Sequence, residues 1–177
     1  MNIQDFLQQS VGKWFHHRTS LELMPQASEV AKANLWIDLL PMNDPSIVAI
    51  CTQANLDPVG AVGALKISWD GRLERQDNSH VGATHLLFVA KGEDQGYFLQ
   101  TQMGQDTLLH QGHYYWGSDE SLTLTLEHQG GMTEERLWYA SENLRLRTSL
   151  RHQGQTVQVV AFCSEIRMGL AAANPSN

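Results

Sequence analysis

The sequence predicts a mainly β protein, folded as one closed antiparallel barrel of about ten strands with an N-terminal helix and one further short helix. Three observations lead to this prediction. Short runs of residues alternate between apolar and polar with a period of two. Turn-forming pairs such as Asp70-Gly71, Gly130-Gly131 and Gln153-Gly154 separate these runs at hairpin spacing. The chain has 177 residues, enough for one domain, and closing the sheet removes its exposed edge strands.

Two segments have helical spacing instead. Residues 2–11 predict an amphipathic helix that ends at Gly12, and its apolar face consists of Ile3, Phe6, Leu7 and Val11. Residues 43–54 predict a second helix, because Pro45 suits a first helical turn. The apolar stripe of this second helix consists of Ile47, Val48 and Cys51.

The remaining runs predict about 9–11 strands. The first two cover residues 13–24 and 28–40. The later ones cover residues 63–69, 72–77, 83–90, 96–102, 111–116, 121–128, 133–140, 144–151 and 156–167. We expect a single barrel domain over residues 1–170 and a flexible tail over residues 171–177.

Composition excludes several classes of protein. The chain has 12 basic and 19 acidic residues, a formal net charge of −7, which disfavours binding to nucleic acid or anionic membranes through bulk charge. No stretch approaches the roughly 18 apolar residues of a membrane span, and the N-terminus does not resemble an export signal. We therefore expect a cytosol-like compartment, with Cys51 and Cys163 as reduced, buried structural residues.

Standard catalytic and metal-binding motifs are missing from the sequence. The eight histidines lack the spacing of a metal site, so we expect no metal. There is no GxSxG, Walker or GxGxxG motif. Cys163 could act as a thiol nucleophile, but its neighbours Phe162 and Ile166 favour an inert buried thiol.

Arginine, glutamate and tryptophan concentrate in the C-terminal third. On neighbouring predicted strands, Arg145 and Arg147 share one face, and so do Glu165 and Arg167. If these faces point into the barrel, they suit a long, aromatic, acidic ligand, because arginine forks pair with carboxylates. If the alternating leucines point inward, the same charged residues form cross-strand ion pairs in water. The alternation alone leaves both orientations open.

Four segments carry a resemblance to a known family. They are residues 12–20 (GKWFHHRTS), 67–71 (ISWDG), 134–149 (EERLWYASENLRLRTS) and 162–167 (FCSEIR). Together they resemble the GKWFxxRTS, SWxG, EERxWFAxPNLRLRTS and FxSEIR blocks of the CpcS/CpeS family of phycobiliprotein chromophore lyases. Tyr139 and Glu142 depart from the third block, and the SLEL sequence after residue 19 departs from the first.

This resemblance implies a lipocalin-like or fatty-acid-binding-protein-like barrel that binds a linear tetrapyrrole (a bilin). The implied activity is that of a lyase, which attaches the bilin (phycocyanobilin or a related one) through a thioether to a cysteine of a phycobiliprotein subunit. The bilin is then a substrate, and no permanently bound cofactor is expected. The alternative is a calycin-type carrier that holds a hydrophobic or tetrapyrrole ligand without covalent transfer.

The resemblance also implies roles for individual residues. Glu165, with Glu135 as second choice, is the expected catalytic carboxylate that holds the pyrrole N–H groups or protonates the bilin. The expected ligand-binding residues are Arg18, Arg145 and Arg147 for the propionates, Trp69 and Trp138 for stacking, and Ser164 for a ring carbonyl.

The implied partners are the bilin and the alpha or beta phycobiliprotein subunit that carries the acceptor cysteine. A homodimer, or a heterodimer with a paralogous lyase subunit, would be typical of this family, and neither nucleic acid nor membrane is expected. The implied location is the cyanobacterial cytosol, or the plastid stroma for a plastid-encoded protein.

Overall fold

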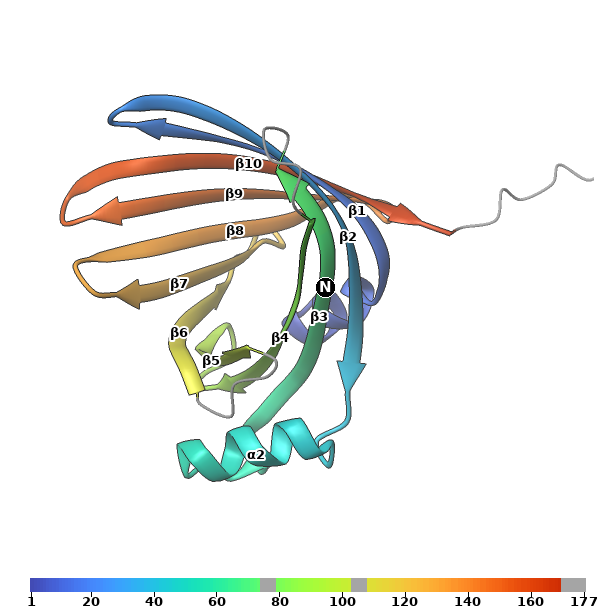
Figure 1. The fold of residues 1–177 in the computed structure, drawn as a ribbon. Coiled ribbons are helices and arrows are strands. Elements are labelled where there is room, and N and C mark those ends of the chain that lie inside the picture. The colour runs from blue at the N-terminus through green and yellow to red at the C-terminus, as the bar shows by residue number, and fades with distance from the viewer. Residues whose placement is uncertain (74–78, 103–107, 170–177) are drawn as a thin grey trace, which may run out of the picture.

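The computed structural model describes residues 1–73, 79–102 and 108–169. In this part of the chain, ten strands form a closed antiparallel barrel (Figure 1), which confirms the predicted fold class. The strands are β1 Gly12–Leu23, β2 Gln26–Leu40, β3 Ala61–Leu73, β4 Ser79–Ala90, β5 Gln95–Gln102, β6 Leu108–Trp116, β7 Leu122–His128, β8 Gly131–Ser141, β9 Leu144–Gln153 and β10 Thr156–Met168. Each strand pairs with its neighbour in the chain, and β1 closes the barrel onto β10.

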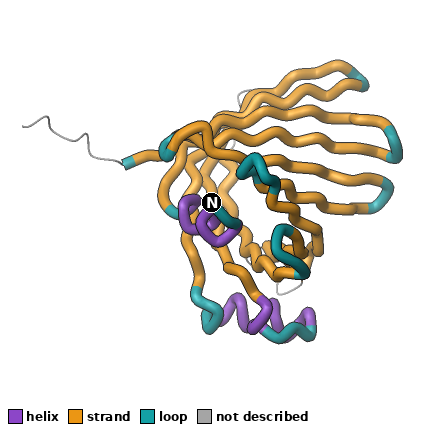
Figure 2. Tube along the Cα trace, turned by 180° about the vertical axis from the view of Figure 1, so that it is seen from behind, coloured by secondary structure: helices purple, strands orange, loops and turns teal. Residues whose placement is uncertain are grey.

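The predicted N-terminal helix is α1 (Ile3–Ser10), which packs into one end of the barrel (Figure 2). A reciprocal capping box between Asn2 and Asp5 stabilises its first turn. The Phe6 ring lies 5.5 Å from the Trp116 ring and 5.0 Å from the Tyr139 ring, measured between centroids. Because α1 and its apolar partners fill this end, the open interior lies towards the other end of the strands.

The second predicted helix is α2 (Pro45–Ala54), capped by the Asp44 side chain, which accepts a hydrogen bond from the Ser46 backbone N–H. A short 3₁₀ turn, Pro58–Gly60, follows it. The helix covers the outer face of β3, β4 and β5. The buried residues between helix and sheet are Ile47, Ile50, Cys51, Ala64, Leu87, Val89, Tyr97 and Leu99. These strands are therefore apolar on both faces.

The strands β9, β10 and β1 have the opposite arrangement. Their polar side chains point inward: Arg145 and Glu165 are buried, and Arg18 lines the interior. Several of their apolar side chains point outward, such as Phe162 and Ile166, which are about half exposed, whereas Trp14 on β1 is buried in the core. The orientation that the alternation left open is thus decided in favour of an inward-facing charged surface.

One turn prediction is wrong. Asp70-Gly71 was expected to form a hairpin turn between two strands, but both residues lie within β3 and pair with β2 and β4. Gly71 is required here because β2 approaches closely: a Cβ atom on Gly71 would lie 2.7 Å from the Cβ of Ala33. The glycine therefore allows close strand packing rather than a turn.

Two other expectations concern residues that the structure does not describe. The predicted tail, residues 171–177, lies outside the described residues, and so does most of the strand predicted over residues 72–77. No helix in the described part of the chain is long and apolar enough to cross a bilayer.

Candidate functional site

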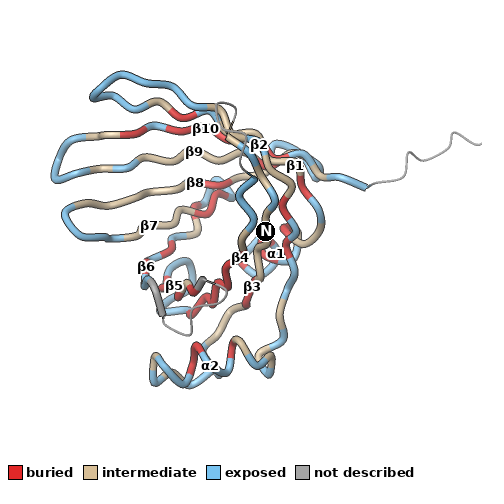
Figure 3. The backbone as a smooth tube through the Cα atoms, in the orientation of Figure 1, coloured by how far each residue is buried: buried red, intermediate tan, exposed pale blue. Residues whose placement is uncertain are grey.

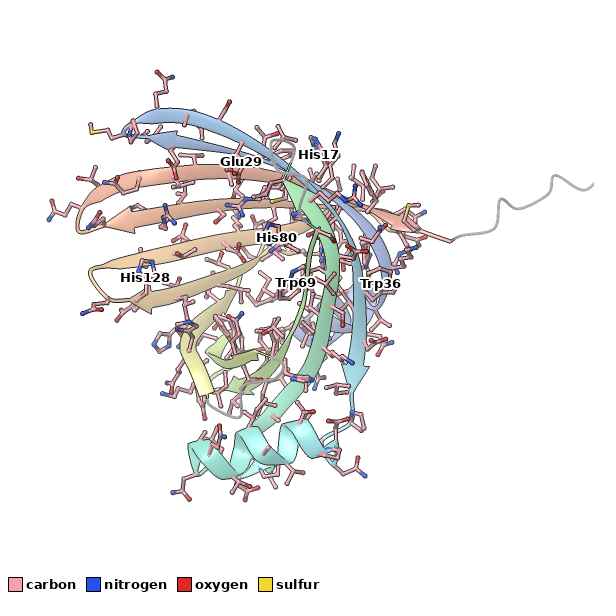
Figure 4. All side chains as sticks on the ribbon, viewed as in Figure 1. His17, Glu29, Trp36, Trp69, His80 and His128 are labelled. Atoms are coloured by element: carbon pink, nitrogen blue, oxygen red, sulfur yellow. The ribbon has the colours of Figure 1, made fainter. Side chains whose placement is uncertain are left out.

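The barrel interior contains a cavity of about 640 Å³, within the range of about 300–1,000 Å³ that is usual for small-molecule sites. Its apolar wall is formed by Leu35, Ile67, Trp69, Leu86, Phe98, Leu124 and Leu126. Its polar wall includes His16, Arg18, Thr133, Glu135, Arg145 and Arg147. Figure 4 marks Trp69 on β3 and His80 on β4, which both belong to the lining. The cavity therefore combines a flat apolar side with a charged side.

Glu165 is the centre of the charged side, and its side chain is fully buried. Arg145 Nε donates a hydrogen bond to its Oε2 at 2.5 Å, and Arg147 Nη2 donates to its Oε1. His16 Nδ1 lies 2.9 Å from the same Oε1. Strand register creates this cluster, because Glu165 is paired with His16 on β1 and with Arg145 on β9.

The two arginines keep Glu165 ionised. Burial alone would raise the pKa of this carboxyl group, but the charges of Arg147 and Arg145 and the hydrogen bond to His16 hold it well below its ordinary value of 4.5. Burial would likewise lower the pKa of Arg147, but the charges of Glu165 and Glu135 raise it above its ordinary value. Glu165 and Arg147 therefore stay charged at neutral pH.

The cavity wall carries excess positive charge. Arg147 Nη1 lies 3.4 Å from Glu135 Oε2, and the buried Arg147 Nε has no hydrogen-bond partner among the described residues. Arg18 also lines the cavity, and within the described ranges no side chain forms an ion pair or hydrogen bond with it. Three guanidinium groups, those of Arg18, Arg145 and Arg147, thus face two carboxylates. Lys32 and Arg72 line the cavity as well, so its wall carries an excess of positive charge that favours an acidic ligand, although the whole chain has a net charge of −7.

The arginine–glutamate cluster is anchored to α1. Arg145 Nη1 donates to Ser10 Oγ at 2.9 Å, and Ser10 Oγ also lies 2.9 Å from the Tyr139 hydroxyl. Trp14 Nε1 donates to the Ser10 carbonyl at 2.8 Å, and the Arg145 guanidinium lies 5.3 Å from the Trp14 ring centre. These contacts hold Arg145 in one position, so that the charged wall is preorganised before any ligand binds.

The two cysteines are free and buried, as expected. Burial raises the pKa of the Cys163 thiol, although Arg147 and Arg18 act in the opposite direction. A thiol with a raised pKa is mostly protonated at neutral pH and is a weak nucleophile.

Six of the eight predicted site residues meet at this cavity. Those that line it are Arg18, Trp69, Glu135, Arg145 and Arg147. Glu165 lies directly behind the two arginines of β9. Trp138 and Ser164 are not part of the lining, and alternation along β8 and β10 directs them to the outside of the barrel.

Sequence patterns did not predict His16, Ser10 or Tyr139 as site residues. His16 could have been found, because it shares a strand face with Trp14 and Arg18, but a histidine without metal spacing was expected to be solvated or structural. Ser10 and Tyr139 are 129 residues apart and have no local signal. Among the described residues, no three His, Cys, Asp or Glu side chains gather in a group that could hold a metal ion.

Comparison with known proteins identifies the family of this chain. Residues 2–168 match the family of CpeS-like proteins. The chain is 39% identical over 182 residues to the chromophore lyase CpcS/CpeS of Thermosynechococcus vestitus, which covers 100% of this chain and 97% of that protein. It is 28% identical over 169 residues to the phycocyanobilin lyase subunit CpcS of a Picosynechococcus species, covering 93% of this chain and 85% of the relative.

A solved structure has the same fold. The S-type phycobiliprotein lyase CpeS from Guillardia theta superposes with a TM-score of 0.86 at 24% sequence identity, covering 97% of this chain and 95% of that one. The ten-strand barrel and the match over residues 2–168 lead to one conclusion, which confirms the resemblance carried by the four sequence segments: this chain belongs to the CpeS-like protein family.

Proposed function

We propose that this protein is a phycobiliprotein chromophore lyase, which binds phycocyanobilin or a related bilin and attaches it through a thioether to a cysteine of a phycobiliprotein subunit. The observation that carries the proposal is the cavity itself: an apolar wall faces an ion-paired cluster next to Arg18, which has no partner in the described chain. A bilin combines a long conjugated body with two propionates, and so matches both sides of such a cavity. The name of the Picosynechococcus relative, a phycocyanobilin lyase subunit, supports the choice of bilin.

The propionates bind at Arg18 and Arg147 in this proposal. Arg18 is free to form a new ion pair, and Arg147 has an unpaired buried Nε–H group besides its contacts with the two glutamates. Guanidinium–carboxylate pairs are charge-assisted and directional, and so they fix the orientation of the ligand. Trp69 stacks on the tetrapyrrole from the apolar wall.

The carboxylates of Glu135 and Glu165 have different roles in this proposal. Glu135 lines the cavity and is partly exposed, so it accepts hydrogen bonds from the pyrrole N–H groups. Glu165 uses both oxygens to hold Arg145, Arg147 and His16, and so acts on the ligand through these side chains. Trp138 and Ser164 are then outside the bilin site and are available to the acceptor subunit.

Attachment depends mainly on positioning. The barrel holds the bilin with its reactive ring near the open end, where the cysteine of the acceptor subunit reaches it. The sulfur adds to the ethylidene carbon, the π electron pair moves into the conjugated system, and the bilin gains one proton for the one that the thiol releases. Nothing is oxidised or reduced in this step. Cys163 is not a covalent carrier, since its thiol is buried and its pKa is raised.

The test combines binding with transfer. Purified protein is titrated with phycocyanobilin and then mixed with an apo-phycobiliprotein subunit, and the denatured subunit is analysed by mass spectrometry. Wild type and Cys163→Ser should both give a covalent bilin–peptide adduct. Uptake of bilin without an adduct on any subunit of a panel would instead identify a calycin-type carrier, and lack of uptake would refute both functions.

A variant of Arg18 tests the proposed propionate contact directly. Removing a charge-assisted contact costs about 1.5–3 kcal/mol, so Arg18→Met should weaken phycocyanobilin binding about 10–150-fold. Arg136→Met, on the outer face of β8, is the control and should leave binding unchanged. The dimethyl ester of phycocyanobilin should bind wild type weakly, and the Arg18→Met substitution should lower its affinity little further. An ester that binds wild type as tightly as the free acid would refute the propionate contacts.

A further inference from the structure

His16 occupies a special place in the cavity. It faces Glu165 across the β1–β10 pair, and its Nδ1 lies 2.9 Å from Glu165 Oε1. An ionised carboxylate can only accept a hydrogen bond, so Nδ1 must carry a proton and donate it. The second ring nitrogen, Nε2, has no partner in the described part of the chain, and 13% of the His16 side chain is exposed to the cavity that it lines. The carboxylate thus orients the imidazole with Nε2 left available to a ligand.

The other titratable groups around His16 are poor sources of a proton. Six such groups share the inner face of the barrel with His16. They are Arg18 on β1, Glu135 on β8, Arg145 and Arg147 on β9, and Cys163 and Glu165 on β10. The arginines do not release protons at physiological pH, and Glu165 is held in its ionised form by two of them. The Cys163 thiol is buried in the wall and is not among the residues that line the cavity, so it does not contact a ligand there.

Three further groups line the cavity on the β2–β4 side: Lys32, Arg72 and His80. All three are exposed, whereas the His16 side chain is mostly buried. Glu135 is the remaining candidate inside the barrel, but its carboxylate lies 3.4 Å from a guanidinium nitrogen of Arg147. His16 combines an orienting carboxylate, a free ring nitrogen and contact with the cavity.

We infer that His16 is the group that exchanges a proton with the bound tetrapyrrole, with Glu165 as its positioning partner. The inference rests on the proposed function, because it assumes a bilin in the cavity. Histidine is the side chain that ordinarily changes charge between about pH 5 and 8, and a neighbouring carboxylate stabilises its imidazolium form.

The proton balance is simple. The imidazolium transfers the Nε2 proton to the imine-type nitrogen of the bilin, which makes the conjugated system cationic and more electrophilic. When the acceptor thiol adds, the sulfur–carbon bond forms and the π electron pair neutralises the chromophore. The proton of the thiol restores the imidazolium, so the net reaction is addition of the thiol across one double bond.

The chain offers a matched pair of variants for the test, since His16 and His17 are adjacent on β1 and point to opposite faces. Figure 4 marks His17 near β1 and β2, and it is not part of the cavity lining. His16→Asn keeps an N–H donor near the Nδ1 position and removes the titratable nitrogen. His17→Asn is the control. Phycocyanobilin is bound without an acceptor subunit, and its visible spectrum and dissociation constant are measured from about pH 5 to pH 9.

We expect a red-shifted, protonated band in wild type and His17→Asn that declines as the pH rises. In His16→Asn the midpoint of this titration should move by at least about one pH unit, or the band should be lost, while the dissociation constant changes less than about threefold. His16→Gln serves as a second variant if His16→Asn does not fold.

Three outcomes would overturn the assignment: a wild-type titration that persists in both His16 variants, a pH-independent spectrum in wild-type protein with bilin bound, or a titration abolished by Glu135→Gln alone. Failure of the wild-type protein to bind bilin at all would refute the proposed function instead, so the two failures are distinguishable.

Discussion

The two sides of the barrel wall use apolar residues in opposite ways. In β3, β4 and β5, apolar side chains occupy both faces, because α2 covers the outside and the cavity wall lies inside. In β9, β10 and β1, charged side chains point inward, and large apolar ones such as Phe162 and Ile166 remain exposed outside. Burial also differs between the two sides: Figure 3 shows buried segments along β4 and mainly intermediate burial along β9.

This contrast separates stability from function. The α2-covered side follows the ordinary rule that apolar groups leave water, and we attribute stability mainly to it. The β9–β10–β1 side breaks that rule, since buried ion pairs are weak contributors to stability when compared with apolar packing. Local violations of this kind are expected at functional sites, and here the violation coincides with the cavity.

The largest effect on stability is expected at Glu165. Glu165→Ala leaves the guanidinium groups of Arg145 and Arg147 without their buried counter-ion, and we expect the free energy of unfolding to fall by about 3–5 kcal/mol. Urea denaturation measures the change. Glu134→Ala, on the outer face of β8, should stay within about 0.5 kcal/mol of wild type. If both variants were equally stable, the charged wall would not depend on this carboxylate.

The contribution of Glu165 should also depend on pH in a defined direction. Its folded-state pKa lies below the ordinary value of 4.5, so its stabilisation is complete above that pH and is lost as the pH falls through the folded pKa. The difference in unfolding free energy between wild type and Glu165→Gln should therefore shrink as the pH falls below about 4.5. A difference that grows over this acidic range would contradict the depressed pKa.

A similar loss is expected from the α2-covered side, but for a different reason. Leu87 is completely buried beneath α2, and Leu87→Ala should cost about 2–5 kcal/mol through lost burial and a residual cavity. Val81→Ala, at an exposed position of the same strand, is the control. Bilin affinity should not change in either variant, measured where both are folded. Weaker bilin binding by Leu87→Ala would show that the two sides are coupled.

The smallest effect is expected on the outer face of β10. Phe162 is 48% exposed, so Phe162→Ser should change the free energy of unfolding by no more than about 0.5 kcal/mol. Thermal unfolding at several protein concentrations measures the effect. A loss of several kcal/mol would mean that another chain covers this face in solution.

Much of the architecture could be predicted from local sequence patterns. Strand runs, both helices and the shared strand face of Arg145 and Arg147 followed from spacing and from the four family-like segments, whereas the inward orientation of that face did not. Asp70-Gly71 could not be assigned, because the same dipeptide serves a hairpin turn or a close strand contact, and only the approach of Ala33 distinguishes them. His16 and Ser10 were missed because their partners, Glu165 and Arg145, are 149 and 135 residues away.

The linear order of residues was sufficient to predict a barrel of about ten strands and its two helices. The sequence did not determine which side of β9, β10 and β1 faces the interior. Alternation with a period of two separates the two faces of a strand, but it does not show which face lies inside the barrel. That choice depended on long-range packing. Helix α1 fills one end of the barrel, its Ser10 receives the Arg145 side chain, and strand register sets Glu165 between two arginines and His16. A charged interior is stable only when all of these partners are present together.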